Sequence, residues 1–598
     1  MALETSHEFG SGVRPAEQNH EEPVDEKRNN SNTNLDSQSN SGITDPASKL
    51  KQPKSEAQLS GTTQASFSEP EDAIVNRQEE EEQAATDYPS GFKFFVIIIG
   101  LSLAVLCIAL DNTIVSTAIP KITDEFAALG DVGWYGSAYL LTLAASQLFF
   151  GRLYSYFSIK LVFLLSLLIF EVGSVVCGAA PSSIALIIGR AVAGIGASGL
   201  FAGAFIIVAS VVPLEKRPLY ISLTSGVYAI ASVLGPLLGG VFTDRVSWRW
   251  CFYINLPFGA VTAVSMIFFL HPKSGERPKA GSWWETVAQY DPFGTLFLTG
   301  SIICLLLALQ WGGTESSWDS PRIIALLVVF AVLLIAFIAV QVWAGENATI
   351  PLRIAKQRSM AFSSLFIFAL SASYFIMVYY IPIWFQAIND DSAMDSGFKT
   401  LPLTISVVVG AMVAGIGTTT IGYYVPFMYA AVVLGSIGAG LIYTWTLELT
   451  TPFSIGCQIL FGFGIGMGLQ QSIVAAQTVL APADIPTGTS IVVFFQNFGG
   501  SFLLSAAQTT FLSKLLSGTS GLPGITSSQV VDAGATGVLS LSSDPAVLQV
   551  IRVAYRDGLI QAYMVALILV CLSLLGVVGM EWRSVKAKAP AEGAALVH

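Results

Sequence analysis

The chain has 598 residues, of which 53% are hydrophobic and only 12% are charged, and its mean hydropathy is +0.63. A soluble protein of this length needs far more polar surface, so the composition argues against that class. The formal net charge of −11 comes largely from the N-terminal 90 residues, and nothing is basic enough to bind nucleic acid. The composition predicts a protein embedded in a lipid bilayer.

The first 90 residues are rich in Glu, Ser, Asn and Gln and contain the acidic run 79–82. Low hydrophobicity and high charge keep such a segment from burying a core, so residues 1–90 are predicted to be a disordered acidic tail. The tail lacks the basic start and short apolar core of a secretory signal. The first apolar span is therefore expected to act as an internal anchor.

About fourteen segments between residues 94 and 581 reach the roughly 20 apolar residues that a membrane helix requires. They are 94–118, 133–153, 159–179, 183–212, 218–243, 249–270, 293–312, 321–345, 359–388, 397–420, 424–445, 453–480, 487–516 and 558–581. The sequence has no long runs of alternating apolar and polar residues, which a membrane β-barrel would require. The fold class predicted is an all-α polytopic membrane protein with 14 transmembrane helices.

Lys and Arg are more frequent in the loops on the same side of the membrane as the N-terminus than in the loops on the opposite side. Because such residues favour the cytoplasm, both the N-terminal tail and a C-terminal tail, 582–598, are predicted to be cytoplasmic. The sequon at Asn347 falls on the same side, so we expect no glycosylation. The six cysteines are scattered in or at apolar segments, and no metal-ligand spacing is present.

Ionisable residues are rare within the spans, and the notable ones are Asp111, Glu171 and Arg190. A charge in hydrocarbon is costly unless it faces a partner or a water-filled cavity, which makes these residues functional candidates. Asp111 and Arg190 are predicted to lie at comparable depth in the outer half of the membrane. Span five carries Gly235, Pro236, Gly239 and Gly240, where small residues permit close helix contact and proline bends the helix.

Four sequence motifs resemble those of the fourteen-span drug:proton antiporters of the major facilitator superfamily. They are LDNTIVSTAIP at 110–120, the Gly-Arg-to-Gly motif at 189–196, GPLLGG at 235–240 and WRWCFYINLP at 248–257. The resemblance covers about residues 90–581. It implies a major facilitator fold with two six-helix bundles, 94–270 and 359–581, two inserted transmembrane helices in 293–345, and a cytoplasmic linker, 271–292. The bundles would rock about a midplane site.

The sequence departs from the family at two loops. Ser155 stands where an acid is usual after span two, and the loop 417–424 carries no charge. A charged lock between the two bundles is therefore not expected at these loops, and hydroxyl groups can substitute as weaker hydrogen bonds. Such uncharged loops resemble those of fungal pumps that export toxins and secondary metabolites.

If spans one and four adjoin, as the resemblance implies, Asp111 and Arg190 can pair. Asp111 is then predicted to carry the proton, with Arg190 controlling its protonation, and the alternative is a static pair that fixes packing. Glu171 is a second candidate for proton coupling or a protonated side chain hydrogen-bonded between helices.

The second bundle holds aromatic and neutral amide side chains in place of charges, which favours bulky, uncharged ligands. The alternative is ordinary packing. The candidate substrate-binding residues are Trp384, Gln386, Gln470, Gln471, Gln496 and Asn497.

The sequence thus predicts a proton-coupled antiporter that exports toxic, largely hydrophobic small molecules across the plasma membrane, with vacuolar or vesicle membranes as alternatives. Other functions left open are transport of amino acids or iron chelates and a non-transporting sensor or scaffold. We find no nucleophile–base pair, metal cluster or phosphate loop, so an enzyme is not expected. The expected partners are a small-molecule substrate, protons and lipid; we expect a monomer with no cofactor, driven by the proton gradient.

Overall fold

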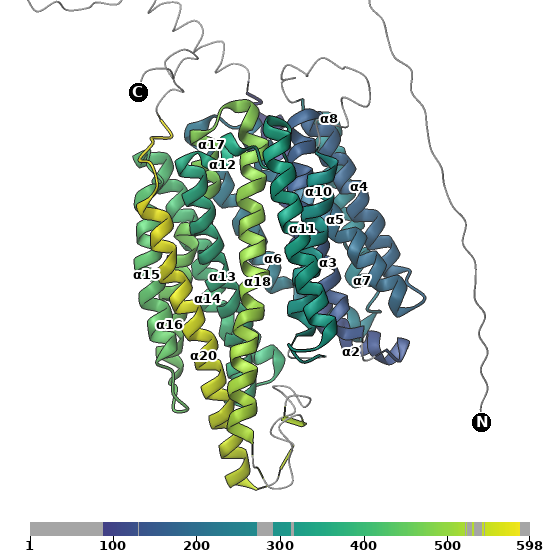
Figure 1. Ribbon diagram of the computed structural model, residues 1–598, viewed down its shortest axis with the longest axis vertical. Coiled ribbons are helices and arrows are strands. Elements are labelled where there is room, and N and C mark those ends of the chain that lie inside the picture. Colours follow the sequence, from purple (N-terminus) through teal and green to yellow (C-terminus); the bar gives the residue numbers. More distant parts are fainter. Residues whose placement is uncertain are drawn as a thin grey trace, which may run out of the picture. The chain divides into compact units, whose positions relative to one another are not determined.

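The computed structural model describes residues 88–128, 131–271, 291–312, 316–520 and 544–586, together with isolated positions between 522 and 542. Nearly all of the predicted tail 1–90, the linker 271–292 and most of the tail 582–598 lie outside these described residues. Within the described residues, long α-helices account for almost all of the regular structure, as Figure 1 shows. The predicted all-α class is confirmed.

The helices form two groups of six spans with a pair inserted between them in the sequence. The first group comprises α2 (Gly91–Phe126), α3 (Val132–Tyr156), α4 (Ile159–Gly178), α5 (Ser183–Val211), α6 (Arg217–Arg245), α7 (Trp250–Tyr253) and α8 (Asn255–Phe269). The inserted pair is α10 (Pro292–Trp311) and α11 (Pro321–Ala344). The second group comprises α12 (Leu352–Lys356), α13 (Arg358–Ala387), α14 (Ala393–Ile421), α15 (Val425–Tyr443), α16 (Thr451–Leu469), α17 (Gln471–Val479), α18 (Ile485–Thr519) and α20 (Pro545–Val578).

Thirteen spans in the described residues are long and apolar enough to cross a membrane. The remaining predicted span is α3, a helix of 25 residues that packs against α5 and α18 and is less apolar than its neighbours. Its hydroxyl groups bond within the bundle; Thr142, for example, donates to the carbonyl of Ala191 on α5 at 2.8 Å. The fourteen predicted segments therefore correspond to helices in the structure.

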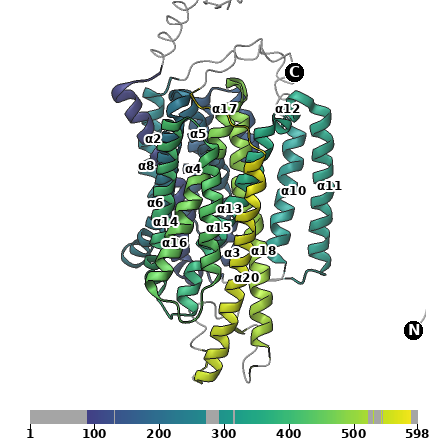
Figure 2. The same ribbon diagram turned by 90° about the vertical axis from the view of Figure 1, so that its left-hand side faces the viewer.

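Two predicted spans are interrupted, and several are longer than predicted, among them the first, α2, which has 36 residues. The sixth span is divided at Ile254 into α7 and α8, and the twelfth is divided at Gln470 into α16 and α17. The helices α18 and α20, of 35 and 34 residues, project beyond the other helices in both views (Figures 1 and 2). At 1.5 Å per residue they exceed a hydrocarbon core of about 30 Å. The segment between the thirteenth and fourteenth predicted spans is therefore partly helical.

The two ends of the helical assembly can be told apart by the residues they hold. We call the end that holds Gly91 and Tyr156 face A, and the opposite end, which holds Trp250 and Thr451, face B. The inserted pair lies at the side of the assembly in Figure 2, where α10 contacts α3 and α18.

The halves pack along α6 and α14, and the hydrogen bonds between them among the described residues lie near face A. The Ser155 and Thr487 hydroxyl groups lie 2.8 Å apart, and the amide of Gln477 donates to the carbonyl of Phe205 at 3.2 Å. A Cβ atom added to Gly151 would lie only 2.5 Å from the Cβ of Ser490. In this conformation the halves are held together at face A by neutral groups, as the absence of an acid at position 155 led us to expect.

Asp291 joins the inserted helices at face A. Its buried carboxylate accepts hydrogen bonds from the backbone N–H of Gly294 at 2.8 Å, from the Gln341 amide at 2.5 Å, and from both the N–H and hydroxyl of Thr349 at 2.8 and 2.9 Å. Thr349 is the third residue of the Asn347 sequon, so its hydroxyl is already engaged. The absence of glycosylation there stays a prediction.

Asp291→Ala is expected to lower the thermal stability of the detergent-purified protein, because the Gln341 amide and the Thr349 N–H lose the carboxylate to which they donate. The cost should be about 3 kcal/mol, and Asp291→Asn, which keeps one acceptor oxygen, should lose less. A thermal-shift assay measures both. Equal melting temperatures for Asp291→Ala and the wild type would contradict this role.

Candidate functional site

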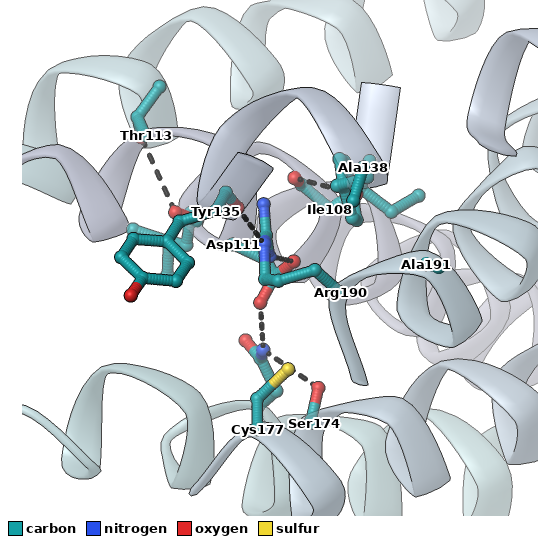
Figure 3. Close-up of polar contacts among 12 residues, drawn as sticks. Ile108, Asp111, Thr113, Tyr135, Ala138, Ser174, Cys177, Arg190 and Ala191 are labelled. Carbon is teal, nitrogen blue, oxygen red and sulfur yellow. Dashed lines mark hydrogen bonds and ion pairs between the residues drawn. The ribbon is translucent and has the colours of Figure 1, made fainter. Parts of the chain in front are cut away.

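Asp111 and Arg190 form a buried ion pair between α2 and α5, drawn in Figure 3. The Nη1 of Arg190 donates to Oδ2 of Asp111, and neither side chain has any exposed surface. Two charges removed from water in this way depend on each other, because an unpaired charge at the same place would be strongly unfavourable. The structure thus brings together the two residues that depth in the membrane had suggested.

Neighbouring helices hold both members of the pair in place. The Nε of Arg190 donates to the carbonyl of Tyr135 at 2.7 Å, and its guanidinium lies 4.4 Å from the ring centroid of Tyr139. The amide of Asn255 donates to Oδ1 of Asp111 and to the hydroxyl of Ser174, both at 3.1 Å. Four further helices therefore surround the pair. Helix α3 makes two contacts with Arg190, and α8 contacts Asp111 through Asn255, which also bonds to α4. Helix α7 contributes the ring of Phe252, 6.0 Å from the guanidinium.

Asn255 is a site residue that the sequence analysis missed. It belongs to the motif at 248–257, but a neutral amide among apolar residues gave no separate signal. It begins α8 directly after the helix break at Ile254, and the side chain is fully buried. Asn255 could have been identified as a polar residue that lies both within the motif at 248–257 and inside a predicted span.

Glu171 lies on α4, one helical turn before Ser174. Its carboxyl group packs on Gly259 of α8, where an added Cβ would lie 1.7 Å from the Glu171 oxygen. Gly259 is one turn from Asn255, and Glu171 is one turn from Ser174, so the two sites are neighbours along both helices. Both carboxyl oxygens of Glu171 are buried without a hydrogen-bond partner. The structure does not place Glu171 in contact with the ion pair.

The glycines of α6 contact the same helix that carries Asp111. Cβ atoms added to Gly235 and Gly239 would lie 2.0 Å from the hydroxyl of Thr113 and 2.3 Å from that of Thr117, both on α2. Glycine is therefore required for the close α2–α6 approach. Gly240 faces open space, and Pro236 lies inside the helix.

The glycine spacing that follows Arg190 on α5 recurs in the second half, where an uncharged residue replaces the arginine. Gln458 on α16 precedes Gly462 and Gly464 by the same intervals at which Arg190 precedes Gly194 and Gly196. A Cβ on Gly194 would lie 2.3 Å from a carbonyl oxygen of α3, and one on Gly462 would lie 2.4 Å from a carbonyl oxygen of α14. Gln458 thus holds the position of Arg190 in the second half, and the buried charge is confined to the first.

A cavity lies between the two halves at the middle of the helices. It encloses about 750 Å³ free of protein atoms, including the part that opens to solvent. Its lining comes from both halves: Ile108, Leu143, Phe201, Ser225, Gly226, Tyr228 and Ala229 from the first, and Tyr374, Phe375, Val407, Val408, Ala411, Leu469, Gln470, Gln496 and Asn497 from the second. Among these described residues, none carries a charge.

Three of the six predicted substrate-binding residues line this cavity. Gln470 is placed there by the break between α16 and α17, and Gln496 and Asn497 come from α18.

The other three lie elsewhere. Trp384 packs against Trp445 with ring centroids 5.4 Å apart, Gln386 donates to Ser396 at 2.8 Å, and Gln471 accepts from Thr418 at 3.2 Å. None of the three is part of the cavity lining, and each contacts another residue of the second half instead.

The ion pair is connected to the cavity through Tyr139. Its hydroxyl donates at 3.4 Å to the carbonyl of Ile108, a lining residue, while its ring lies against the Arg190 guanidinium. Ile108 is also within one turn of Asp111 on α2. Tyr139 therefore contacts both the cavity wall and the Arg190 member of the pair.

The motif at 248–257 also forms a clamp at face B. Glu125 at the end of α2 accepts from the indole of Trp248 at 2.7 Å and pairs with Arg249 at 2.9 Å. The hydrogen bond from Arg249, and next the one from Trp248, holds the pKa of Glu125 below its usual range. The clamp joins the ends of α2 and α7 outside the apolar spans.

Glu125→Gln is expected to destabilise the protein slightly at neutral pH, by at most about 1 kcal/mol, because the carboxylate is 44% exposed. A carboxylate with a lowered pKa stabilises the fold above its unfolded pKa, and this contribution is lost as the pH falls through the folded pKa. Thermal-shift curves of the two proteins should therefore converge in acid. If the difference in melting temperature between the two proteins persists or grows at acidic pH, the charge of Glu125 is not its cause.

Two six-helix halves around a central cavity, with a buried ion pair beside it, define a polytopic membrane transporter. The family model described as Major Facilitator Superfamily matches residues 101–504. The chain belongs to this superfamily. It is 53% identical over 511 residues to the MFS-type transporter phomT of Diaporthe leptostromiformis, covering 85% of this chain and 86% of that protein.

Other similar proteins are named as pumps. The chain is 50% identical to the efflux pump aflT of Aspergillus parasiticus, covering 85% of this chain and 99% of that protein. It is 45% identical to the aspyridones efflux protein of Neocamarosporium betae, covering 86% and 91%. Among solved structures, the proton:xylose symporter XylE matches with a TM-score of 0.52 at 12% identity over 82% of this chain and 98% of that one. That likeness confirms the fold.

Proposed function

We propose that this protein is a proton-coupled antiporter that exports toxic, largely hydrophobic small molecules, such as drugs, mycotoxins or other secondary metabolites. The observation that carries the proposal is the connection of a titratable, buried carboxylate to an uncharged cavity between two halves. The names of the similar fungal pumps support export as the direction of transport.

Asp111 is the proton carrier and Arg190 its partner in this proposal. A proton bound to Asp111 removes the negative charge that holds the guanidinium, while the Tyr135 carbonyl and the Tyr139 ring continue to bind it. The α2–α5 contact then changes, and Tyr139 passes the change to Ile108 in the cavity wall. A substrate that displaces Ile108 acts on the same contacts in reverse, so proton and substrate affect each other's binding.

The proposed location is the plasma membrane, with face A toward the cytoplasm. Basic residues gather at the helix ends and loops of this face, as the positive-inside rule requires. They include Arg152, Lys160, Lys216, Arg217, Arg353 and Arg358. In this orientation, the neutral contacts between Ser155 and Thr487 close the cytoplasmic side.

Glu171→Gln tests whether the second carboxyl group also carries a proton. If it does, the variant should move fewer protons per substrate molecule than the wild type in reconstituted vesicles. An unchanged ratio assigns Glu171 to the α4–α8 contact instead.

Export itself is tested by expressing the chain in a yeast strain that lacks its own pumps. Expression should lower the intracellular amount of hydrophobic toxins and raise tolerance to them, and a protonophore should remove both effects. Unchanged accumulation across a panel of such compounds, with the protein present at the cell surface, would contradict the proposal.

A further inference from the structure

The cavity wall presents two kinds of chemistry to a ligand. Aromatic rings come from both halves: Phe201 and Tyr228 form a pair with centroids 5.7 Å apart, and so do Tyr374 and Phe375. Such rings favour flat aromatic ligands, which can stack on a ring face or meet its edge. Without a charged group among the described lining residues, an ionic ligand would lose its hydration with no compensating partner.

Three neutral amides supply the second kind of chemistry, and all belong to the second half. Gln470, Gln496 and Asn497 each have one amide atom that is buried without a hydrogen-bond partner, namely Oε1, Oε1 and Nδ2. Buried amides are normally hydrogen-bonded, because an unsatisfied group loses its interaction with water and gains nothing in return. These three amides therefore have unused capacity to donate and to accept at one cavity.

We propose that the cavity selects uncharged, flat aromatic compounds that carry both hydroxyl and carbonyl groups, which means hydroxylated aromatic ketones, over purely apolar or ionic compounds. This inference rests on the proposed function, since it names the substrate class of the same transporter. Hydroxyl groups donate to the amide oxygens and a carbonyl accepts from the amide nitrogen, while the ring system lies among the four aromatic side chains.

A ligand without these polar groups fills the same space but leaves the amides unsatisfied. One or two hydrogen bonds correspond to an affinity ratio of about tenfold. Selectivity within a series of equal shape should therefore depend on hydroxyl groups and should disappear when the amides are replaced.

Gln471 provides a matched control, because it is buried next to Gln470 in the sequence but is hydrogen-bonded to Thr418 and does not line the cavity. Gln470→Leu and Gln496→Leu nearly keep the side-chain size while removing the two amide oxygens, and Asn497→Leu removes the amide nitrogen. Gln471→Leu makes the same chemical change outside the cavity.

The test measures binding of three anthraquinones to the purified full chain in lipid nanodiscs, with thermal shift as the check of folding. In mildly acidic buffer, which keeps the hydroxyl groups protonated, 2,6-dihydroxyanthraquinone should bind about tenfold more tightly than 2,6-dimethoxyanthraquinone. Anthraquinone-2-sulfonate should not bind. The double variant Gln470→Leu/Gln496→Leu should bind the two neutral compounds about equally. Asn497→Leu should bind both more weakly and keep the preference, because both compounds carry the ring carbonyls that its nitrogen binds. Gln471→Leu should keep the wild-type affinities and preference.

Equal wild-type affinities for the two neutral compounds, a preference that survives the double substitution Gln470→Leu/Gln496→Leu, binding of the sulfonate, or no binding of any compound would each overturn this inference. Binding is measured without transport, so the two proposals can fail separately. Selective binding without export would contradict the proposed export function and leave the proposed ligand class standing. Export without hydroxyl selectivity would contradict the ligand class and leave the export function standing.

Discussion

Asp111→Asn is expected to abolish proton-driven transport, because the amide keeps the size of the carboxyl group but cannot take up and release a proton near neutral pH. The substitution also leaves Arg190 buried without a counter-charge. Breaking a buried pair by removing one partner costs about 3–5 kcal/mol, so the single variant should also melt at a lower temperature. Transport into inside-out vesicles and thermal shift measure the two effects.

The double variant Asp111→Asn/Arg190→Gln separates the proton from the stability of the fold. Both side chains are then neutral and can hydrogen-bond to each other, so the melting temperature should return close to the wild-type value. Transport driven by a pH gradient should remain absent. Proton-dependent transport at wild-type rates in either Asn variant would show that Asp111 does not carry the proton.

A second large effect is expected from cross-linking the halves at face A. The Ser155 and Thr487 oxygens are 2.8 Å apart, so cysteines at these two positions can form a disulfide with little movement. Oxidation should stop turnover, because alternating access requires this contact to open, and reduction should restore it. Ligand binding from the face-B side should persist in the oxidised protein.

The single variants Ser155→Cys and Thr487→Cys serve as controls, since neither can form this bridge and each removes only one hydroxyl. They should transport at near wild-type rates under oxidising conditions. Full turnover of the oxidised double variant, with the cross-link verified on a gel, would show that this contact does not open during transport.

The fold was largely predictable because the bilayer imposes one simple requirement on each span. Apolar windows located the fourteen helices, and only the ends and breaks differed. The helical segment from Pro545 to Asp557 escaped because Arg552, Arg556 and Asp557 make it too polar to be identified from apolarity. The breaks at Ile254 and Gln470 escaped because apolarity does not distinguish a continuous helix from an interrupted one.

The ion pair was predictable from two facts together: Asp111 and Arg190 lie at comparable depth, and the family resemblance implies that spans one and four adjoin. The cavity lining was harder. Gln470 and Gln471 are adjacent in the sequence and chemically identical, yet one lines the cavity and the other bonds to Thr418. Their directions depend on the local break in the helix, which the residue types do not reveal.

The central claim is that substrate moves against protons through the Asp111–Arg190 site. The most direct test places the purified protein in vesicles that contain a pH indicator, imposes a gradient of 2,6-dihydroxyanthraquinone, and uses protein-free vesicles as the blank. Substrate entry through the wild type should make the interior more alkaline, and the Asp111→Asn/Arg190→Gln variant should show no change. Acidification of the interior, or substrate entry with no proton movement, would contradict the claim.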